Sequence, residues 1–151
     1  DLGVWMMNVH TLGGKAMMTA AREAIGNQPD RPLLIGVTLL TSMDQTTFEQ
    51  IGLQGTIADT VLRLARLADK SALDGVVCSA QEARKLRAQH NESFQLITPG
   101  IRPKNSAHGD QHRTMTPAEA INAGSNYLVI GRPITEAIDP MAALEAIEKS
   151  L

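Results

Sequence analysis

Five short runs of apolar residues divide the chain into regular blocks. The runs cover residues 4–9, 33–40, 75–78, 94–98 and 127–130. Each run is almost continuously hydrophobic, with little of the alternation that marks a strand with one face in water. Such runs are typical of strands that are covered on both faces. We therefore predict five buried β-strands at these positions.

Helical patterns lie between these runs. Residues 16–25 are rich in alanine and methionine, and residues 56–72 repeat apolar side chains at helical spacing. Ser79 and Thr116 each precede a glutamate by three residues, the capping box with which many helices begin. Asp139, followed by a proline, begins the last predicted helix in a similar way. A strand followed by a helix, five times over, predicts an α/β fold with a parallel sheet.

Two architectures of this class compete. A doubly wound open sheet of five strands fits within 151 residues. A (β/α)₈ TIM barrel needs roughly 200–250 residues, so the chain would supply only about five of its eight βα units. Length favours the open sheet. The first residues favour the barrel, because Asp1, Leu2 and Gly3 resemble the last turn of a helix, as if the chain began in mid-fold.

Composition excludes several classes of partner. The chain is 43% hydrophobic and 20% charged, with a formal net charge of -2 and few aromatic residues. We expect no nucleic-acid partner, because there is neither a basic excess nor a set of rings on which bases stack. No apolar run has the length that spans a bilayer, so no membrane partner is expected. The single cysteine, Cys78, lies in an apolar run and is expected to be a buried, reduced thiol, which fits a cytoplasmic protein.

Polar residues follow the predicted strands, where ligands of parallel α/β folds bind. Two of the five strands are followed by a glycine and an arginine, Gly100 with Arg102 and Gly131 with Arg132. Backbone N–H groups of a glycine turn beside an arginine fork commonly bind phosphate. The pair predicts a phosphorylated small molecule as ligand. No His, Cys or carboxylate cluster has the spacing of metal ligands, so no metal is expected.

A polar segment, residues 104–114, separates the two arginine turns. It has no periodicity, which is typical of a functional loop or a mobile surface segment. Gln111 is its strongest candidate for a functional role, because it comes late, where the loop returns toward the next helix. His10 ends a strand, and a structural role is expected for it. His90, His108 and His112 lie in polar surroundings and are expected to be solvated.

Several motifs together resemble one family. In chain order they are VWMMNVH, LTSM, DGVVCSAQEA, TPGIRP, GDQHRTMTPAEA and YLVIGRPIT. The set, which extends over essentially the whole chain, is similar to orotidine 5'-phosphate decarboxylases of the bacterial type. The resemblance implies a (β/α)₈ TIM barrel, with residues 1–151 forming its C-terminal part from strand four to helix eight. The first three βα units would be absent from this chain.

The resemblance also implies a set of binding residues. Gly131 and Arg132 would bind the 5'-phosphate, and Arg102 would line the phosphate side. Gln111 would bridge phosphate and pyrimidine, and Thr41 would lie beside the pyrimidine. The implied partners are orotidine 5'-phosphate as substrate and a second copy of the protein in a homodimer.

The catalytic residues of the family have no counterpart here. Its chemistry rests on an alternating Lys–Asp–Lys–Asp array that includes an Asp-x-Lys-x-x-Asp motif, and this sequence contains no such motif. The resemblance implies a carbon–carbon lyase of pyrimidine biosynthesis that converts orotidine 5'-phosphate to uridine 5'-phosphate without any cofactor. The 151-residue chain would carry the binding half of the site and would be inactive by itself.

Three alternatives remain at this point. Related barrels that decarboxylate or condense sugar phosphates share the phosphate half of the site, although Thr41 and Gln111 argue against them. An inactive, truncated fragment that only binds phosphate is the second. The third, a free-standing open-sheet domain, would leave two sheet edges without partners.

Overall fold

The structure, a computed structural model, describes residues 3–103 and 113–151. Its single described sheet has five strands in the order β1-β2-β3-β4-β5, and every neighbouring pair is parallel. The strands are β1 (Met6–His10), β2 (Leu33–Val37), β3 (Gly75–Val77), β4 (Gln95–Thr98) and β5 (Tyr127–Leu128). Strand order thus follows chain order, as expected when each strand is joined to the next by a helical crossover.

Helices connect these strands and follow the last one. They are η1 (Thr11–Gly13), α1 (Gly14–Ile25), α2 (Gln45–Gln50), α3 (Ile57–Lys70), α4 (Ala80–Arg87), α5 (Pro117–Asn122), α6 (Arg132–Thr135) and α7 (Pro140–Glu148). The predicted capping boxes are confirmed, since Ser79 caps α4 with Glu82 and Thr116 caps α5 with Glu119. Asp139 accepts hydrogen bonds from two backbone N–H groups at the start of α7.

Five strands lie at the predicted positions, but only β2, β3 and β4 are mostly buried as predicted, while β1 and β5 at the sheet edges have no fully buried residue. Their ends also differ from the prediction. The first strand begins at Met6 rather than at residue 4, and the last is reduced to two residues. The short helices α2 and α6 were not predicted. Helix α2 begins because the Asp44 side chain accepts a hydrogen bond from the N–H of Thr47 at 2.8 Å. Only Phe48 of α2 is buried, so the helix has no apolar stripe that would mark it in the sequence.

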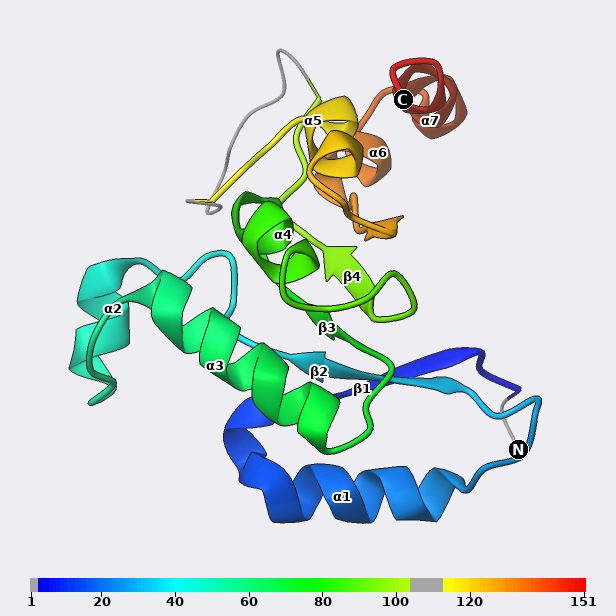
Figure 1. Ribbon diagram of the computed structural model, residues 1–151. Helices are drawn as coiled ribbons and strands as arrows, with labels where there is room; N and C mark the ends of the chain where they lie inside the picture. Colours follow the sequence, from blue (N-terminus) through cyan, green and yellow to red (C-terminus); the bar gives the residue numbers. More distant parts are fainter. Residues whose placement is uncertain (1–2, 104–112) are drawn as a thin grey trace.

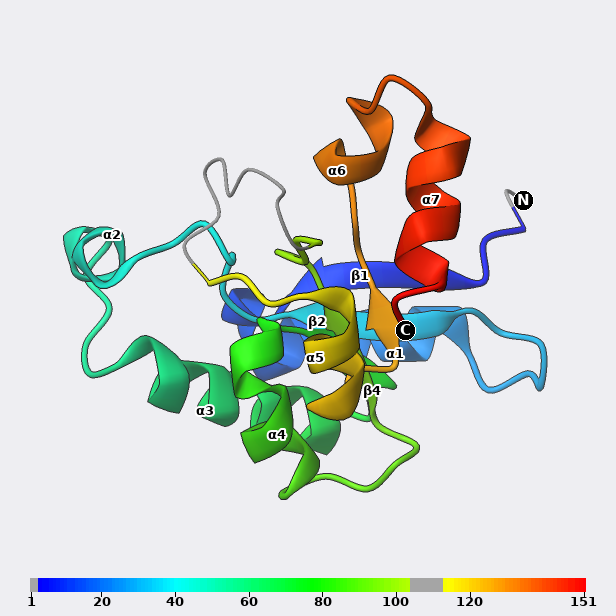
Figure 2. The same cartoon turned by 90° about the horizontal axis from the view of Figure 1, so that it is seen from above.

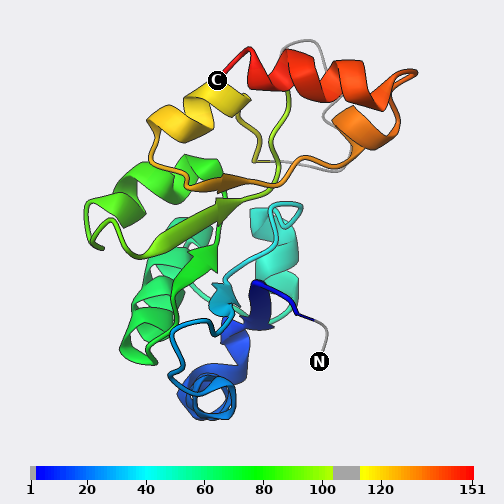
Figure 3. The same ribbon diagram turned by 90° about the vertical axis from the view of Figure 1, so that its right-hand side faces the viewer.

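The sheet is curved, and helices α1, α3, α4 and α5 cover its convex side (Figures 1 and 3). Figure 2 shows α6 and α7 beyond the last strand, and α7 lines a cavity together with the start of α5. Side chains from the convex side of the sheet pack against the helices in one apolar core. Its members include Met18, Leu34, Phe48, Val61, Leu64, Ala68, Val76, Leu86 and Leu96. Burial of this set is the main stabilising contribution, since each large side chain contributes about 1.5–3 kcal/mol.

The concave side of the sheet carries the alternate positions of the strands. Because Leu34, Val76 and Leu96 pack against the helices, their strand neighbours face the other way. Tyr127, in register with Ile97, lies on this concave side. Its ring lies 5.4 Å from the ring of Trp5, centre to centre, so the two edges of the sheet approach each other there.

An ion pair joins three strands at their amino ends. The Arg31 guanidinium donates to both Asp74 carboxylate oxygens at 2.6 and 2.7 Å, and the N–H of Leu34 donates to the same carboxylate at 2.7 Å. The backbone of Asp74 bonds Leu34 on one side and Gln95 on the other. Burial by itself would raise the pKa of Asp74, but these hydrogen bonds outweigh burial and hold that pKa below its usual value.

Replacing this carboxylate should destabilise the fold in a pH-dependent way. We expect Asp74→Asn to lower the free energy of unfolding by about 2 kcal/mol at pH 7, because two charged hydrogen bonds are lost. The depressed pKa in the folded state means that the stabilisation is present above the unfolded-state pKa of about 3.9 and is lost as pH falls through the folded-state value. Urea unfolding at pH 7 and pH 3 measures both effects.

The exposed Asp30, which lies beside Arg31 in the chain, supplies the control. Asp30→Asn should change the free energy of unfolding by less than about 0.5 kcal/mol. An Asp74→Asn effect that is absent at pH 7, or undiminished at pH 3, would contradict the role given to the ion pair.

Candidate functional site

The carboxyl ends of all five strands lie along one edge of the sheet, because neighbouring strands are parallel. Backbone bonds continue the pairing past the strands, with the N–H of Thr38 donating to Val77 and that of Val129 donating to Thr98. The Thr38 hydroxyl also donates to the carbonyl of Val77, at 2.7 Å. The turns that follow the strands are therefore held close to the sheet. Side chains from different turns can then contact the same ligand.

The turn after β4 places the first predicted arginine. Gly100 has a φ of 75°, in the left-handed region that favours glycine. Ile101 is fully buried, and Arg102 is only 7% exposed. The Arg102 guanidinium donates to the carbonyl of Ile101 at 2.9 Å, and its backbone N–H donates to Met115. The sequence prediction of a cation after this strand thus corresponds to a well-fixed, largely buried guanidinium.

The turn after β5 places the second pair. Gly131 precedes α6, and Arg132 is its first residue, with both residues exposed. A Cβ atom added to Gly131 would meet no other atom within 4 Å, so packing inside this chain does not require glycine there. A missing Cβ next to open space lets a ligand approach the backbone closely.

A cavity shows that the two arginine turns lie close together. Its volume is about 490 Å³, and it lies between the start of α5, α6 and α7. Pro103, which follows Arg102, and Pro133, which follows Arg132, both line it. Neither arginine and neither glycine lines the cavity, so the two turns are related here only through the prolines that follow them.

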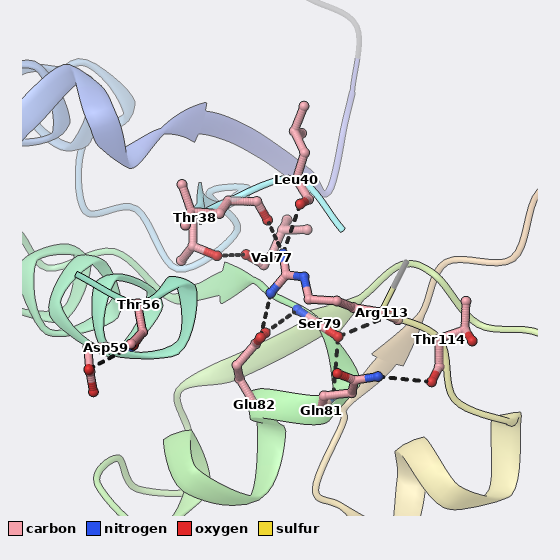
Figure 4. A network of polar contacts seen from close by, with 11 residues as sticks. Thr38, Leu40, Thr56, Asp59, Val77, Ser79, Gln81, Glu82, Arg113 and Thr114 are labelled. Atoms are coloured by element: carbon pink, nitrogen blue, oxygen red, sulfur yellow. Dashed lines mark hydrogen bonds and ion pairs between the residues drawn. The ribbon is translucent and has the colours of Figure 1, made fainter. Parts of the chain in front are cut away.

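Thr41 lies in the turn after β2. Its side chain is only 5% exposed. The backbone just before it is contacted by Arg113, whose Nη2 donates to the carbonyl of Leu40 at 2.8 Å and to that of Leu39 at 3.4 Å (Figure 4). Because the strands are parallel, Thr41 lies at the same edge of the sheet as the arginine turns. Gln111, the remaining predicted binding residue, lies outside the described residues.

Arg113 and Glu82 lie near the carboxyl ends of the strands, and the sequence analysis did not select them. Arg113 forms an ion pair with Glu82, and its carbonyl accepts a hydrogen bond from the Ser79 hydroxyl at 3.3 Å. Burial raises the pKa of Glu82, and the Arg113 charge limits that rise. The capping box predicted that Glu82 lies at a helix start, but no motif in the sequence indicated its ion pair with Arg113.

One histidine prediction is wrong. His90 was expected to be solvated, but only 2% of its side chain is exposed. Its ring stacks on Phe94 with centres 4.4 Å apart, and its Nδ1 lies 3.1 Å from a carboxylate oxygen of Asp69. His10 ends β1 and is exposed, so the expected structural role is not supported by packing. His108 and His112 lie outside the described residues.

Within residues 3–103 and 113–151, no three His, Cys, Asp or Glu side chains lie together where they could hold a metal ion. Among the same residues, no helix combines the length and hydrophobicity needed to cross a membrane. Cys78 is fully buried, as predicted, and burial raises the pKa of its thiol, with the charge of Glu82 adding to the rise.

Known proteins resemble this chain over its whole length. The family described as "Orotidine 5'-phosphate decarboxylase / HUMPS family" matches residues 1–147. An orotidine 5'-phosphate decarboxylase of Nitrosococcus oceani is 59% identical over 151 residues, which make up all of this chain and 65% of that protein. One from Vibrio vulnificus is 59% identical over 154 residues, and the match covers 66% of its length. The chain thus spans about 65% of the length of the curated relatives it matches.

Solved structures show the same fold. Orotidine 5'-phosphate decarboxylase from Lactobacillus acidophilus superposes with a TM-score of 0.81 at 38% identity, covering 98% of this chain and 63% of that one. The enzyme from Pyrococcus horikoshii, at 22% identity and a TM-score of 0.68, supports the fold alone; the match covers 95% of this chain and 59% of that one. The five parallel βα units therefore belong to a (β/α)₈ TIM barrel, and the open-sheet alternative is wrong.

The reactivity of the Cys78 thiol gives a direct test of its burial. We expect Cys78 to resist iodoacetamide at pH 8 in the folded protein, because the thiolate is the reactive form and burial disfavours it. Unfolding in urea should restore a rate at least about 100-fold higher. Mass spectrometry of the alkylated protein measures both rates. Rapid labelling without urea would show that a thiol is accessible beneath the strand ends.

Proposed function

Because the chain belongs to the orotidine 5'-phosphate decarboxylase / HUMPS family, we propose that its protein converts orotidine 5'-phosphate to uridine 5'-phosphate and CO₂. The observation that carries the proposal is the pair of glycine–arginine turns, one after β4 and one after β5, whose following prolines, Pro103 and Pro133, line one cavity. The names of the relatives, at 59% identity, point to the same reaction.

Each binding residue has a proposed role. Arg132 would pair with the 5'-phosphate, which would also accept hydrogen bonds from the backbone around Gly131. Arg102 adds positive charge on the phosphate side. Thr41 would contact the pyrimidine, and Gln111 would reach both groups. An arginine fork and a glycine turn suit a phosphate because each offers several N–H donors to its oxygens.

The reaction requires a second set of residues. When the bond between C6 and the carboxylate breaks, the electron pair stays on C6, and this carbon must then take a proton. Fixed charges near C6 would stabilise the carbanion-like centre, and a lysine would supply the proton. This chain contains no Asp-x-Lys-x-x-Asp motif, so we propose that its 151 residues bind the substrate and that the catalytic array lies outside them.

Phosphate binding at a distance from C6 contributes to the rate. Contacts made by Arg132 do not touch the reacting bond, but their binding energy holds the pyrimidine in the position where charge stabilisation is strongest. We also propose a cytoplasmic homodimer. A lone buried cysteine fits a reducing compartment, and the exposed Leu12 and Leu40 after β1 and β2 offer apolar surface near the site to a second subunit.

The assay is the release of ¹⁴CO₂ from substrate labelled in its carboxyl group. We expect the 151-residue chain alone to release none. The same residues joined to the remaining third of the Nitrosococcus oceani relative should release CO₂. A joined protein that folds and binds uridine 5'-phosphate but releases no CO₂ would contradict the proposed reaction. Light scattering of the active protein would test the homodimer.

A single substitution tests the phosphate role. We expect Arg132→Ala in the active protein to lower kcat/KM by about 150-fold, because losing a charged hydrogen-bond partner removes about 3 kcal/mol of transition-state stabilisation. Arg84→Ala removes an exposed arginine on α4 and should leave kcat/KM unchanged. An unchanged kcat/KM for Arg132→Ala would rule out its role.

A further inference from the structure

Arg113 makes a set of long-range contacts that the binding roles above do not use. Its guanidinium lies between Glu82 at the start of α4 and the carbonyls of Leu39 and Leu40 after β2. Figure 4 shows it at the centre of this polar network. Only 11% of its side chain is exposed, so the contacts are shielded from water.

The Leu40 carbonyl is the critical point of this network. It accepts one hydrogen bond from the N–H of Met43 at 3.0 Å and a second from Arg113 at 2.8 Å. Leu40 is 52% exposed, whereas its neighbours Leu39 and Thr41 are buried, so Leu40 itself is held by its backbone rather than by its side chain. Arg113 therefore adds a fixed contact to the turn at the residue directly before Thr41.

Glu82 fixes the other end of Arg113. One carboxylate oxygen pairs with the guanidinium, while the other accepts the N–H of Ser79 at 2.9 Å. Glu82 is only 5% exposed and belongs to the first turn of α4. The orientation of the guanidinium is thus set by the start of a helix, which is a rigid support.

We propose that Arg113 is a positioning residue, which places Thr41 for the pyrimidine by holding the carbonyls of residues 39 and 40. This proposal rests on the proposed function, because it takes Thr41 as the residue beside the pyrimidine. Arg113 does not touch the substrate in this role. It connects the start of α4 to the turn after β2 and so holds the turn at a fixed place relative to that helix.

The two functions of the arginine can be separated by substitution. Arg113→Lys keeps a positive charge that pairs with Glu82. It loses the planar fork, whose two Nη atoms bind the carboxylate and the carbonyls at the same time. The lysine variant should therefore fold while leaving the Leu40 carbonyl with a single hydrogen bond.

The first measurement is a double-mutant cycle in the active protein that joins these residues to the rest of the barrel. We expect Arg113→Lys to lower kcat/KM by about 10-fold with Thr41 present and by less than about 3-fold in a Thr41→Val background. Arg84→Lys, the same change at an exposed position of α4, should have no effect in either background. Equal losses in the two backgrounds, or no loss with Thr41 present, would overturn the proposal.

The second measurement is hydrogen exchange without substrate. Arg113→Lys should speed exchange of the Met43 amide, which bonds the same carbonyl, while amides of β3 keep their rates. Unchanged exchange at Met43 would overturn the proposal even if activity fell. If the protein carrying Arg113 and Thr41 released no CO₂ at all, the proposed function would fail. The exchange rates would then decide separately whether Arg113 holds the turn.

Discussion

Apolar packing on the convex side of the sheet is the constraint on which the other features depend. Met18, Phe48 and Leu96 belong to one core that joins α1, α2 and α3 to the strands. Each such side chain contributes about 1.5–3 kcal/mol, more than a typical exposed ion pair. Because this core fixes the parallel strands against the helices, it also fixes where every strand ends. The apolar core therefore also determines the positions of the turns that carry the candidate site.

The two ends of the sheet are stabilised by different means. At the amino ends, Arg31 and Asp74 form a two-pronged ion pair that also binds backbone of neighbouring strands. At the carboxyl ends, Arg113 and Glu82 join a helix start to a turn. Arg132 is exposed there, whereas Arg102 is largely buried and donates to the carbonyl of Ile101. The amino ends thus carry a closed ion pair, while the carboxyl ends carry the residues of the candidate site. That division matches the usual arrangement of barrels, where stability and chemistry occupy opposite faces.

Local sequence patterns predicted where the strands lie, because each apolar run, such as residues 33–40, is bounded by polar residues and turns. They did not predict that β1 and β5 are the exposed edges of the sheet, since that depends on neighbouring strands. Capping boxes at Ser79 and Thr116 marked helix starts, since each motif is complete within four residues. Contacts between distant residues could not be predicted. Arg113 meets Glu82 across 31 residues and Leu40 across 73. His90 was misjudged because its polar neighbours in sequence give no sign of the ring of Phe94 above it.

The hydrogen bonds from Arg113 to the carbonyls of Leu39 and Leu40 constrain which residues can be substituted around them during evolution. A carbonyl is present whatever residue occupies position 40, so a change of side chain there does not remove the hydrogen bond from Arg113. Glu82 offers a carboxylate instead, and a change there removes the partner itself. Among homologous sequences, positions 113 and 82 should therefore change together, while a change at position 40 requires none at position 113. Arg113 and Leu40 would then be in contact without showing correlated substitutions.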